Sequence, residues 1–398
     1  MQLLYHKHDI ILTLETLIMV DTIVLMLPSS QFKIVKPNDF TPSTDLVYKN
    51  AAVRAVQNAT TKEHKLGIYK PRLTITHRKI IDNRANMAGI DTHSSIALKI
   101  EFSAPKLLLG NNLEELQNKD FDRMITKLHE RMLNMGVEID QGYLKHAPVI
   151  AIHYAKNISL KDGSTPFHFI SKIKQSYIPS RMDSNLTHYR NAGSGFKIHC
   201  NSHEIVFYDK LYDLHQSHIS TKRSIDRDNS FDLKILDGIR TKKRKFEILR
   251  MEVRLNKRSK IKQLLSSINI KSDLTLRKLF KPAIAQKVLL HYVNQLECKR
   301  PALLELDHVS DKALLSTLVV HNPMLTPKQI LQFFGFKKIL ETMTAEELKM
   351  ILGKKHNRSW TRLLSDIQHI QLPITNSPFT IIKEQIQKYQ PIKIRKTL

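Results

Sequence analysis

The chain has 398 residues, of which 63 are Lys or Arg and 37 are Asp or Glu, so its formal net charge is +26. This length predicts two or three domains with a substantial hydrophobic core, and 41% hydrophobic residues with only 11 Gly and 15 Pro exclude a low-complexity chain. The excess of positive charge favours an anionic partner, either nucleic acid or an anionic membrane surface.

The longest apolar stretch, residues 10–28, lacks the properties of a membrane span. It contains Glu15 and Asp21, and each such charge costs about 2.5–3.5 kcal/mol at a bilayer centre. The N-terminus also lacks the basic segment, clean apolar core and cleavage site of a secretory signal. The chain has two cysteines, Cys200 and Cys298, which is typical of a reducing compartment. We therefore expect a cytoplasmic protein without a membrane partner.

Alternating apolar and polar residues, or β-branched runs, predict seven strands in the first two thirds of the chain. They span residues 20–26, 71–77, 95–103, 147–154, 195–200, 203–209 and 246–255. Asn201 and Ser202 fit a hairpin turn between two of these strands. Helical spacing of apolar residues predicts helices at 120–137 and 166–176. The charged segment 213–245 is expected to be an exposed connection, either a nucleic-acid-facing arm or a solvated loop.

Beyond about residue 257 the pattern becomes helical. Helices are expected at residues 258–267, 274–280, 282–297, 326–343 and 344–352. Thr326 and Pro327 form an N-cap and N1 pair, and Thr344 with Glu347 forms a capping box. Two of these helices could form a helix-turn-helix, although plain bundle packing is the commoner arrangement.

These elements predict an α+β fold. Residues 19–260 are expected to form an antiparallel sheet with flanking helices, and residues 261–398 a smaller all-helical domain that binds DNA. Residues 1–18 are expected to be an optional extension, because the motifs described below begin near residue 19.

Two of the predicted strands carry reactive side chains on one face. Strand alternation places Glu204, Tyr208 and Lys210 on the same face of the first strand. In the second strand, the run ILRMEVRL at 248–255, Arg250, Glu252 and Arg254 share one face. The same alternation is also typical of the solvated face of any antiparallel sheet.

These residue types suit phosphodiester chemistry. A tyrosyl oxygen has a pKa of about 10 and needs activation before it can act as a nucleophile. Lys210, about 7 Å from Tyr208 along a strand, could lower that pKa or hold the scissile phosphate. Glu252 could bind Mg²⁺ or Mn²⁺, which prefer oxygen ligands. Arg250 and Arg254 could bind neighbouring phosphates as planar forks.

Five segments, in order between about residues 19 and 345, resemble the replication initiator of filamentous phages, the gene II protein, and its phage and plasmid relatives. They are VDTIVLMLP (20–28), IEFSAPKLLLGNNLEEL (100–116), HEIVFYDKLYDL (203–214), ILRMEVRLNKR (248–258) and LQFFGFKKILE (331–341). The resemblance implies a palm-like sheet with an exposed catalytic face. It also implies a rolling-circle initiator that nicks and later rejoins one DNA strand, with Tyr208 as nucleophile and acidic residues holding a metal ion.

The chain departs from this family in its metal ligands. It lacks the His-hydrophobic-His motif of the large tyrosine-nickase superfamily, and Ala151 stands near the position where the relatives carry an Asp. His153, two residues further on the same strand face, could replace that ligand, or could be a partly buried sheet histidine. Glu101 is a second candidate carboxylate. The expected metal set is therefore Glu252, Glu101 and His153.

The resemblance also implies the partners: double-stranded origin DNA, the displaced single strand, and a host helicase and polymerase in a bacterial cytoplasm. The basic run Lys242, Lys243, Arg244 and Lys245 is expected to contact DNA. Two alternatives stay open, a non-catalytic DNA-binding replication repressor of the same family and a mobile-element relaxase or transposase. A second motif, His199-Cys200-x-x-His203, fits either a metal site or a strand–turn–strand.

Overall fold

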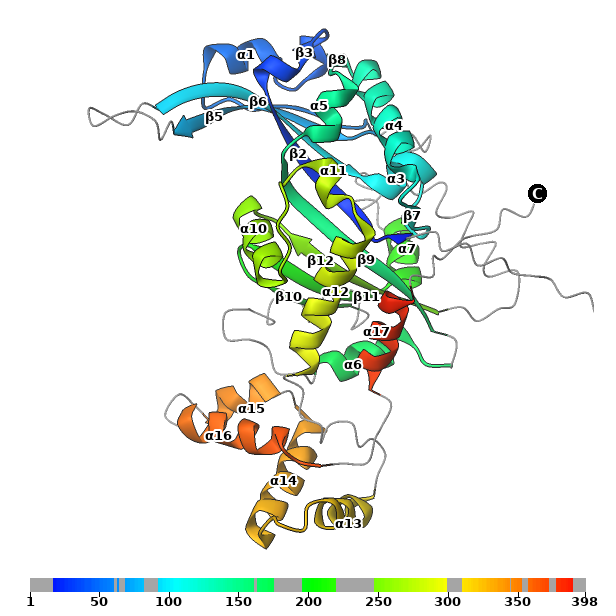
Figure 1. The fold of residues 1–398 in the computed structure, drawn as a ribbon, viewed down its shortest axis with the longest axis vertical. Helices are drawn as coiled ribbons and strands as arrows, with labels where there is room; N and C mark the ends of the chain where they lie inside the picture. Colours follow the sequence, from blue (N-terminus) through cyan, green and yellow to red (C-terminus); the bar gives the residue numbers. More distant parts are fainter. Residues whose placement is uncertain are drawn as a thin grey trace, which may run out of the picture.

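The structure is a computed structural model that describes residues 17–60, 63, 69–81, 92–160, 163–174, 195–219, 247–298, 310–343, 345–352, 357–371 and 377–388. Its centre is an eight-stranded antiparallel sheet in the order β10-β11-β12-β9-β2-β6-β5-β4 (Figure 1). The strands are β2 (Val20–Pro28), β4 (Ala55–Gln57), β5 (Arg72–Ile81), β6 (Thr92–Ser103), β9 (Val149–Leu160), β10 (Gly195–His199), β11 (His203–Asp209) and β12 (Glu247–Leu255).

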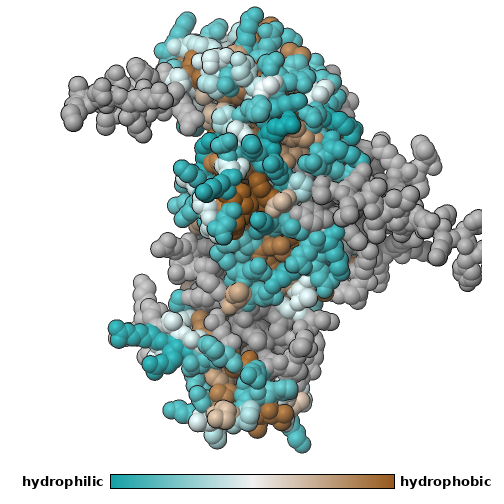
Figure 2. Space-filling model, in the orientation of Figure 1, coloured by the Kyte–Doolittle hydropathy of each residue, from teal (hydrophilic) through white to brown (hydrophobic). Residues whose placement is uncertain are grey.

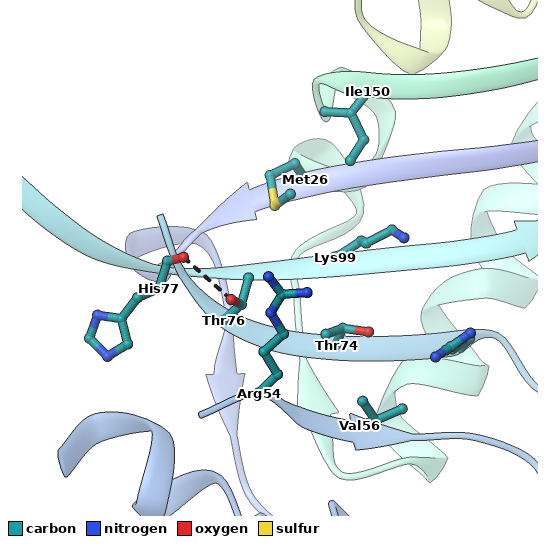
Figure 3. A pocket seen from close by; sticks show the side chains of 9 residues that line it. Met26, Arg54, Val56, Thr74, Thr76, His77, Lys99 and Ile150 are labelled. Carbon is teal, nitrogen blue, oxygen red and sulfur yellow. Dashed lines mark hydrogen bonds between the residues drawn. The ribbon is translucent and has the colours of Figure 1, made fainter. Parts of the chain in front are cut away.

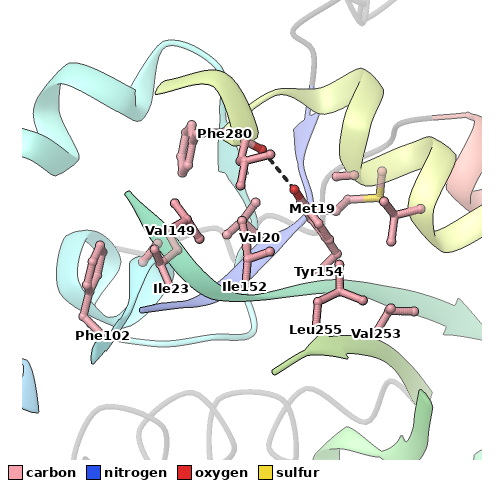
Figure 4. Close-up of a cluster of buried hydrophobic side chains, with 14 of the residues drawn as sticks. Met19, Val20, Ile23, Phe102, Val149, Ile152, Tyr154, Val253, Leu255 and Phe280 are labelled. Atoms are coloured by element: carbon pink, nitrogen blue, oxygen red, sulfur yellow. Dashed lines mark hydrogen bonds between the residues drawn. The ribbon is translucent and has the colours of Figure 1, made fainter. Parts of the chain in front are cut away.

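One face of this sheet forms the main hydrophobic core, because every second residue of its strands is apolar. Leu25, Ile100, Ile152, Met251 and Phe207 all lie on this face and are fully buried. Figure 4 shows the cluster at the centre, where the buried phenol of Tyr154 donates a hydrogen bond of 3.2 Å to the carbonyl of Leu279. The opposite face is polar, and the candidate site lies on it.

Helices cover the core face of the sheet. These are α4 (Asp120–Asn134), α5 (Gln141–His146), α6 (Pro166–Lys174), α10 (Arg258–Ser267), α11 (Leu276–Leu279), α12 (Pro282–Glu297) and α17 (Pro378–Gln387). Helices α10, α12 and α17 lie in front of the sheet in Figure 1. The apolar side chains of α4 at positions 124, 128 and 132 are fully buried, as their helical spacing requires.

Shorter elements flank the sheet. They are α1 (Thr44–Lys49), α3 (Ala104–Leu109), α7 (Lys210–Ile219) and the two-stranded pairs β1 (Leu17–Ile18) with β7 (Leu116–Gln117) and β3 (Lys33–Ile34) with β8 (Val137–Glu138). Two 3₁₀ turns, η1 (Ser29–Gln31) and η2 (Pro37–Asp39), follow β2. Helices α3 and α7 follow β6 and β11 directly, so both begin beside the polar face.

A second hydrophobic cluster lies at the lower end of the molecule in Figure 1. It is formed by α13 (Asp311–His321), α14 (Pro327–Leu340), α15 (Ala345–Leu352) and α16 (Asn357–Gln368). Apolar side chains also reach its surface, at Val320, Met324, Leu331 and Ile351. Figure 2 shows apolar patches at this end, below a mostly hydrophilic visible face.

The α+β fold expected from the sequence is confirmed, and all seven predicted strands are present. The short strands β1, β3, β4, β7 and β8 were not predicted. The main core continues past the expected boundary at residue 260, because α10, α11, α12 and α17 all contribute to it. The separate helical cluster therefore spans only residues 310–371. Among the described residues, no helix combines the length and apolar character needed to cross a membrane.

Candidate functional site on the polar sheet face

A cavity of about 240 Å³ lies on the polar face where β11, β12, β9, β2 and β6 meet α3 and α7. It is lined by Asp21, Thr22, Glu101, Lys106, Asn112, His153, Tyr208, Lys210, Asp213, Leu214, Glu252 and Arg254. The strand register explains this convergence, because Tyr208 pairs with Arg250 and Arg254 pairs with His153 across neighbouring strands. Six side chains singled out in the sequence thus meet at one place.

The centre of the cavity is a hydrogen bond between Tyr208 and Glu252. The phenol oxygen of Tyr208 donates to Oε1 of Glu252 at 2.7 Å. Burial raises the pKa of Tyr208 well above 10, and the negative charge of Glu252 raises it further. In the free protein Tyr208 is therefore a neutral phenol, already in contact with a carboxylate that can accept its proton.

Both oxygens of Glu252 are occupied by protein donors. Arg250 Nε donates to Oε1 at 2.7 Å, and Arg254 donates to Oε2 through Nε and Nη2 at 2.8 and 2.7 Å. Glu252 is only 3% exposed. Burial alone would raise the pKa of this carboxyl, but the guanidinium groups of Arg254 and Arg250 hold it well below its usual range.

Arg250 is not placed to bind DNA, contrary to the sequence-based expectation. Its guanidinium is 3% exposed and contacts Asp21 at 3.1 Å, the carbonyl of Asn112 at 2.7 Å and Oδ1 of Asn157 at 3.2 Å, in addition to Glu252. These partners use most of its donors inside the protein. Arg250 therefore orients Glu252 and joins β12 to β2. Arg254, with a side chain 32% exposed, can reach a ligand in the cavity.

Asp21 is a member of this network that sequence reasoning did not assign to the site. It lies where the pairing of β2 with β9 shifts register, and it is buried beside Arg250. Thr22 and Ser103 donate to its two oxygens at 3.2 and 3.3 Å. A lone carboxylate in an apolar run was a signal for this role, since an unpaired charge is rarely buried.

Lys210 differs from its predicted position. It is the first residue of α7 and not part of β11, so its ammonium does not emerge beside the Tyr208 hydroxyl along a strand. The side chain is buried, with Nζ 5.7 Å from the centre of the Tyr208 ring and 3.8 Å from Asp213. The Lys210 ammonium thus lies over the ring of Tyr208 and not beside its hydroxyl. Its acidic partner, Asp213, was not predicted from the sequence.

The three predicted metal ligands line the same cavity without forming a metal site. His153 contacts Oδ1 of Asn256 at 3.2 Å, and burial lowers its pKa. Glu101 pairs with Lys99 at 3.2 Å, while the oxygens of Glu252 are taken as described. Within the part of the chain that the structure describes, no three His, Cys, Asp or Glu side chains converge on one point. Glu252, Glu101 and His153 therefore do not form a preassembled site, and metal binding at this cavity stays a prediction.

The remaining sequence candidates lie elsewhere. Cys200 and His203 are in contact at the β10–β11 hairpin, with Sγ 2.9 Å from Nδ1, which agrees with the strand–turn–strand interpretation. Lys242, Lys243, Arg244 and Lys245 lie outside the described residues. Lys106, in α3, was not predicted, although its ammonium adds a positive charge to the cavity wall.

Comparisons with family models, with curated proteins and with solved structures give no match for this chain. The resemblance to the gene II initiators therefore stays a proposal. The function must be inferred from the geometry of the cavity.

Proposed function

We propose that this protein is a rolling-circle replication initiator that nicks and rejoins one strand at a phage or plasmid origin, with Tyr208 as the nucleophile. The observation that carries the proposal is the 2.7 Å hydrogen bond from the Tyr208 hydroxyl to Glu252 in a cavity whose wall also holds Arg254 and Lys106. A nucleophile, a proton acceptor and cations for phosphate oxygens are the groups that phosphoryl transfer needs.

The proposed reaction is a transesterification. The Tyr208 oxygen attacks the scissile phosphorus, a tyrosyl–phosphorus bond forms, and the bond from phosphorus to the 3′ oxygen breaks. The Tyr208 proton passes to Glu252, and the departing 3′ oxygen takes up a proton from solvent. Atoms and charge balance without a nucleotide cofactor, and the reverse reaction rejoins the strand.

Arg254 couples phosphate binding to activation of Tyr208. In the free protein, Arg254 donates two hydrogen bonds to Glu252 and helps keep its pKa low, so Glu252 is a weak base. A phosphate in the cavity competes for the same guanidinium fork. When Arg254 turns toward the phosphate, Glu252 loses a cation and becomes a better proton acceptor. Arg250 stays buried and continues to hold Glu252 in place.

The test is nicking of supercoiled DNA from the replicon that carries the gene, measured with Tyr208→Phe. The variant should lose nicking by at least a thousandfold and lose the protein–DNA link that survives denaturing gel electrophoresis. It should bind duplex within about threefold of wild type, because phosphate contacts carry most of the affinity. Tyr212→Phe, which removes a hydroxyl from α7 outside the cavity, is the matched control. Nicking by the Tyr208→Phe variant at the wild-type rate would rule out this nucleophile.

A second candidate is a DNA-binding replication repressor without catalysis. Its support is the electrostatic state of the pair, because the pKa of Tyr208 is raised, the pKa of Glu252 is lowered and, among the described residues, no metal ligand set is formed. These features oppose deprotonation of the phenol in the free protein. Tight origin binding by the wild type with no nicking and no covalent link would favour this function over the first.

A further inference from the structure

A second, larger cavity of about 550 Å³ lies at the other end of the polar sheet face. It is lined by Met26, Arg54, Val56, Arg72, Thr74, Thr76, His77, Lys99 and Ile150, from β2, β4, β5, β6 and β9 (Figure 3). In this view Arg54 rises beside Thr74 and Thr76, and Met26 and Ile150 lie across the hollow from it. The nucleophile proposed above does not line this cavity.

The two cavities lie on the same face of the sheet. On β6, Lys99 lines the second cavity, and Glu101, two residues further along, lines the Tyr208 cavity. On β2, Met26 lines the second cavity, and Thr22, four residues earlier, lines the Tyr208 cavity. Residues two or four apart on a strand share a face, so a ligand can pass from one cavity to the other without crossing the sheet.

The second cavity carries positive charge that the described part of the protein does not neutralise. Arg54 and Arg72 are both exposed, and among the described residues neither guanidinium has an ion pair or a hydrogen bond. Lys99 is paired with Glu101 at 3.2 Å. Because Glu101 lines the Tyr208 cavity, this ion pair lies between the two cavities. Two such guanidinium groups at the rim of one hollow favour an anionic ligand with repeated charges.

The floor of the cavity is partly apolar. Met26, Val56 and Ile150 are half-buried and line it together with the Thr74 and Thr76 side chains. Such a mixture suits a ligand that presents flat apolar surfaces as well as phosphates. Unpaired bases offer those surfaces, whereas the bases of a duplex are stacked and paired inside it.

We propose that this cavity binds the single-stranded DNA that continues from the phosphate at Tyr208. This binding role rests on the proposed nicking function and adds a substrate-binding subsite to it. Phosphates contact Arg54, Arg72 and Lys99, and bases lie on Met26 and Ile150. Five strand spacings of about 4.8 Å separate β11 from β5, which is roughly 24 Å. This span corresponds to about seven nucleotides at a stacked spacing of 3.4 Å.

The test compares binding of a fluorescent twelve-residue oligodeoxythymidine with binding of a duplex of the same length, by anisotropy at several salt concentrations. The protein is the full chain carrying Tyr208→Phe, so that binding is measured without cleavage. In this background, Arg54→Gln with Arg72→Gln should weaken single-strand binding at least tenfold. The log–log salt slope should become shallower by about 1.4, since each phosphate contact in a single strand contributes about 0.7. Duplex binding should change less than threefold.

The matched control is Lys127→Gln with Lys145→Gln, which removes two positive charges from α4 and α5 on the core side of the sheet. It should leave single-strand affinity within threefold. Unchanged single-strand binding by the double-arginine variant, or an equal loss for single strand and duplex, would overturn the assignment. These outcomes are independent of the Tyr208→Phe nicking result, because a binding subsite can fail while the nucleophile is correct, and the reverse.

Discussion

At the scale of single residues, Glu252 is the centre of the site. It is nearly inaccessible and contacts Tyr208, Arg250 and Arg254, of which Arg250 is equally buried. Charges removed from water are tolerated only when each has a partner. The same contacts that position the nucleophile therefore also stabilise the fold, and substitutions here act on both.

Glu252→Gln should destabilise the protein by about 3–5 kcal/mol, because it leaves the buried Arg250 guanidinium without its carboxylate. The measurement is the free energy of unfolding from urea titration. Glu130→Gln is the control, since Glu130 pairs with Lys127 on the exposed side of α4 and such exposed pairs contribute little to stability. Equal losses for the two variants would contradict the prediction that the buried Arg250 guanidinium depends on Glu252.

His203 makes the free energy of unfolding depend on pH. Burial, with the nearby charge of Lys260, lowers its pKa to about 4, from about 6.5 in an unfolded chain. As the pH falls, His203 therefore takes up a proton first in the unfolded state. Its contribution to the free energy of unfolding, at most about 3 kcal/mol, is present above pH 6.5 and is lost between pH 6.5 and 4.

The free energy of unfolding of wild type should thus decrease from pH 7 to pH 4.5, and His203→Gln should flatten that decrease. Part of the slope should remain, because burial also lowers the pKa of His153. His321→Gln, at the exposed end of α13, is the control and should keep the wild-type slope. A wild-type slope in His203→Gln would mean that this imidazole titrates normally.

At the scale of elements, periodicity predicted the long strands and helices well because their sequences repeat the burial pattern several times. Helix α12 has the predicted bounds, 282–297. Strands of two or three residues, such as β4, contain too few residues to show alternation. Lys210 was assigned to the wrong element because strand alternation simply continued past Asp209, where α7 begins.

Capping chemistry was also predictable. Thr326 caps α14 and forms a capping box with Gln329, while Thr344 lies outside the described residues. Thr326→Ala should lower the stability of the helical cluster by about 1 kcal/mol. Thr317→Ala is the matched control, because Thr317 lies within α13 of the same cluster and the cap of that helix is Ser310. Thermal unfolding followed by the fluorescence of Trp360, in α16, reports on this cluster, and equal effects of the two substitutions would contradict the capping role.

At the scale of the whole molecule, the sequence showed which residues share a face of a strand, but not the order in which strands pair. The site depends on that order, since Asp21, Glu101 and Tyr208 meet only because β2 lies between β9 and β6. Long-range packing could not be predicted for α17 either. It returns to the sheet after the helical cluster, where Gln385 bonds to the backbone of Ser159 and Lys383 pairs with Glu297.

This arrangement determines which residues can be removed to separate duplex binding from strand cleavage. A chain ending at residue 260 would lose α10, α11, α12 and α17, all of which belong to the main core, and should not fold. Because Lys383 pairs with Glu297, the ends of the insertion lie close together. Replacing residues 299–376 with a Gly/Ser linker therefore removes the helical cluster and keeps α17 in place.

If the helical cluster holds origin duplex, as the sequence predicts for the C-terminal helical region, the linker variant should bind duplex at least tenfold more weakly than the full chain. Its log–log salt slope should be shallower by about 0.9 for each phosphate that the cluster binds. It should still cut a single-stranded oligonucleotide containing the nick site, because Tyr208, Glu252 and Arg254 all lie on the sheet. Full-length protein with Tyr208→Phe supplies the opposite control, with duplex bound and no strand cut. A folded linker variant that binds duplex as tightly as the full chain would place duplex recognition on the sheet or on the 242–245 basic run.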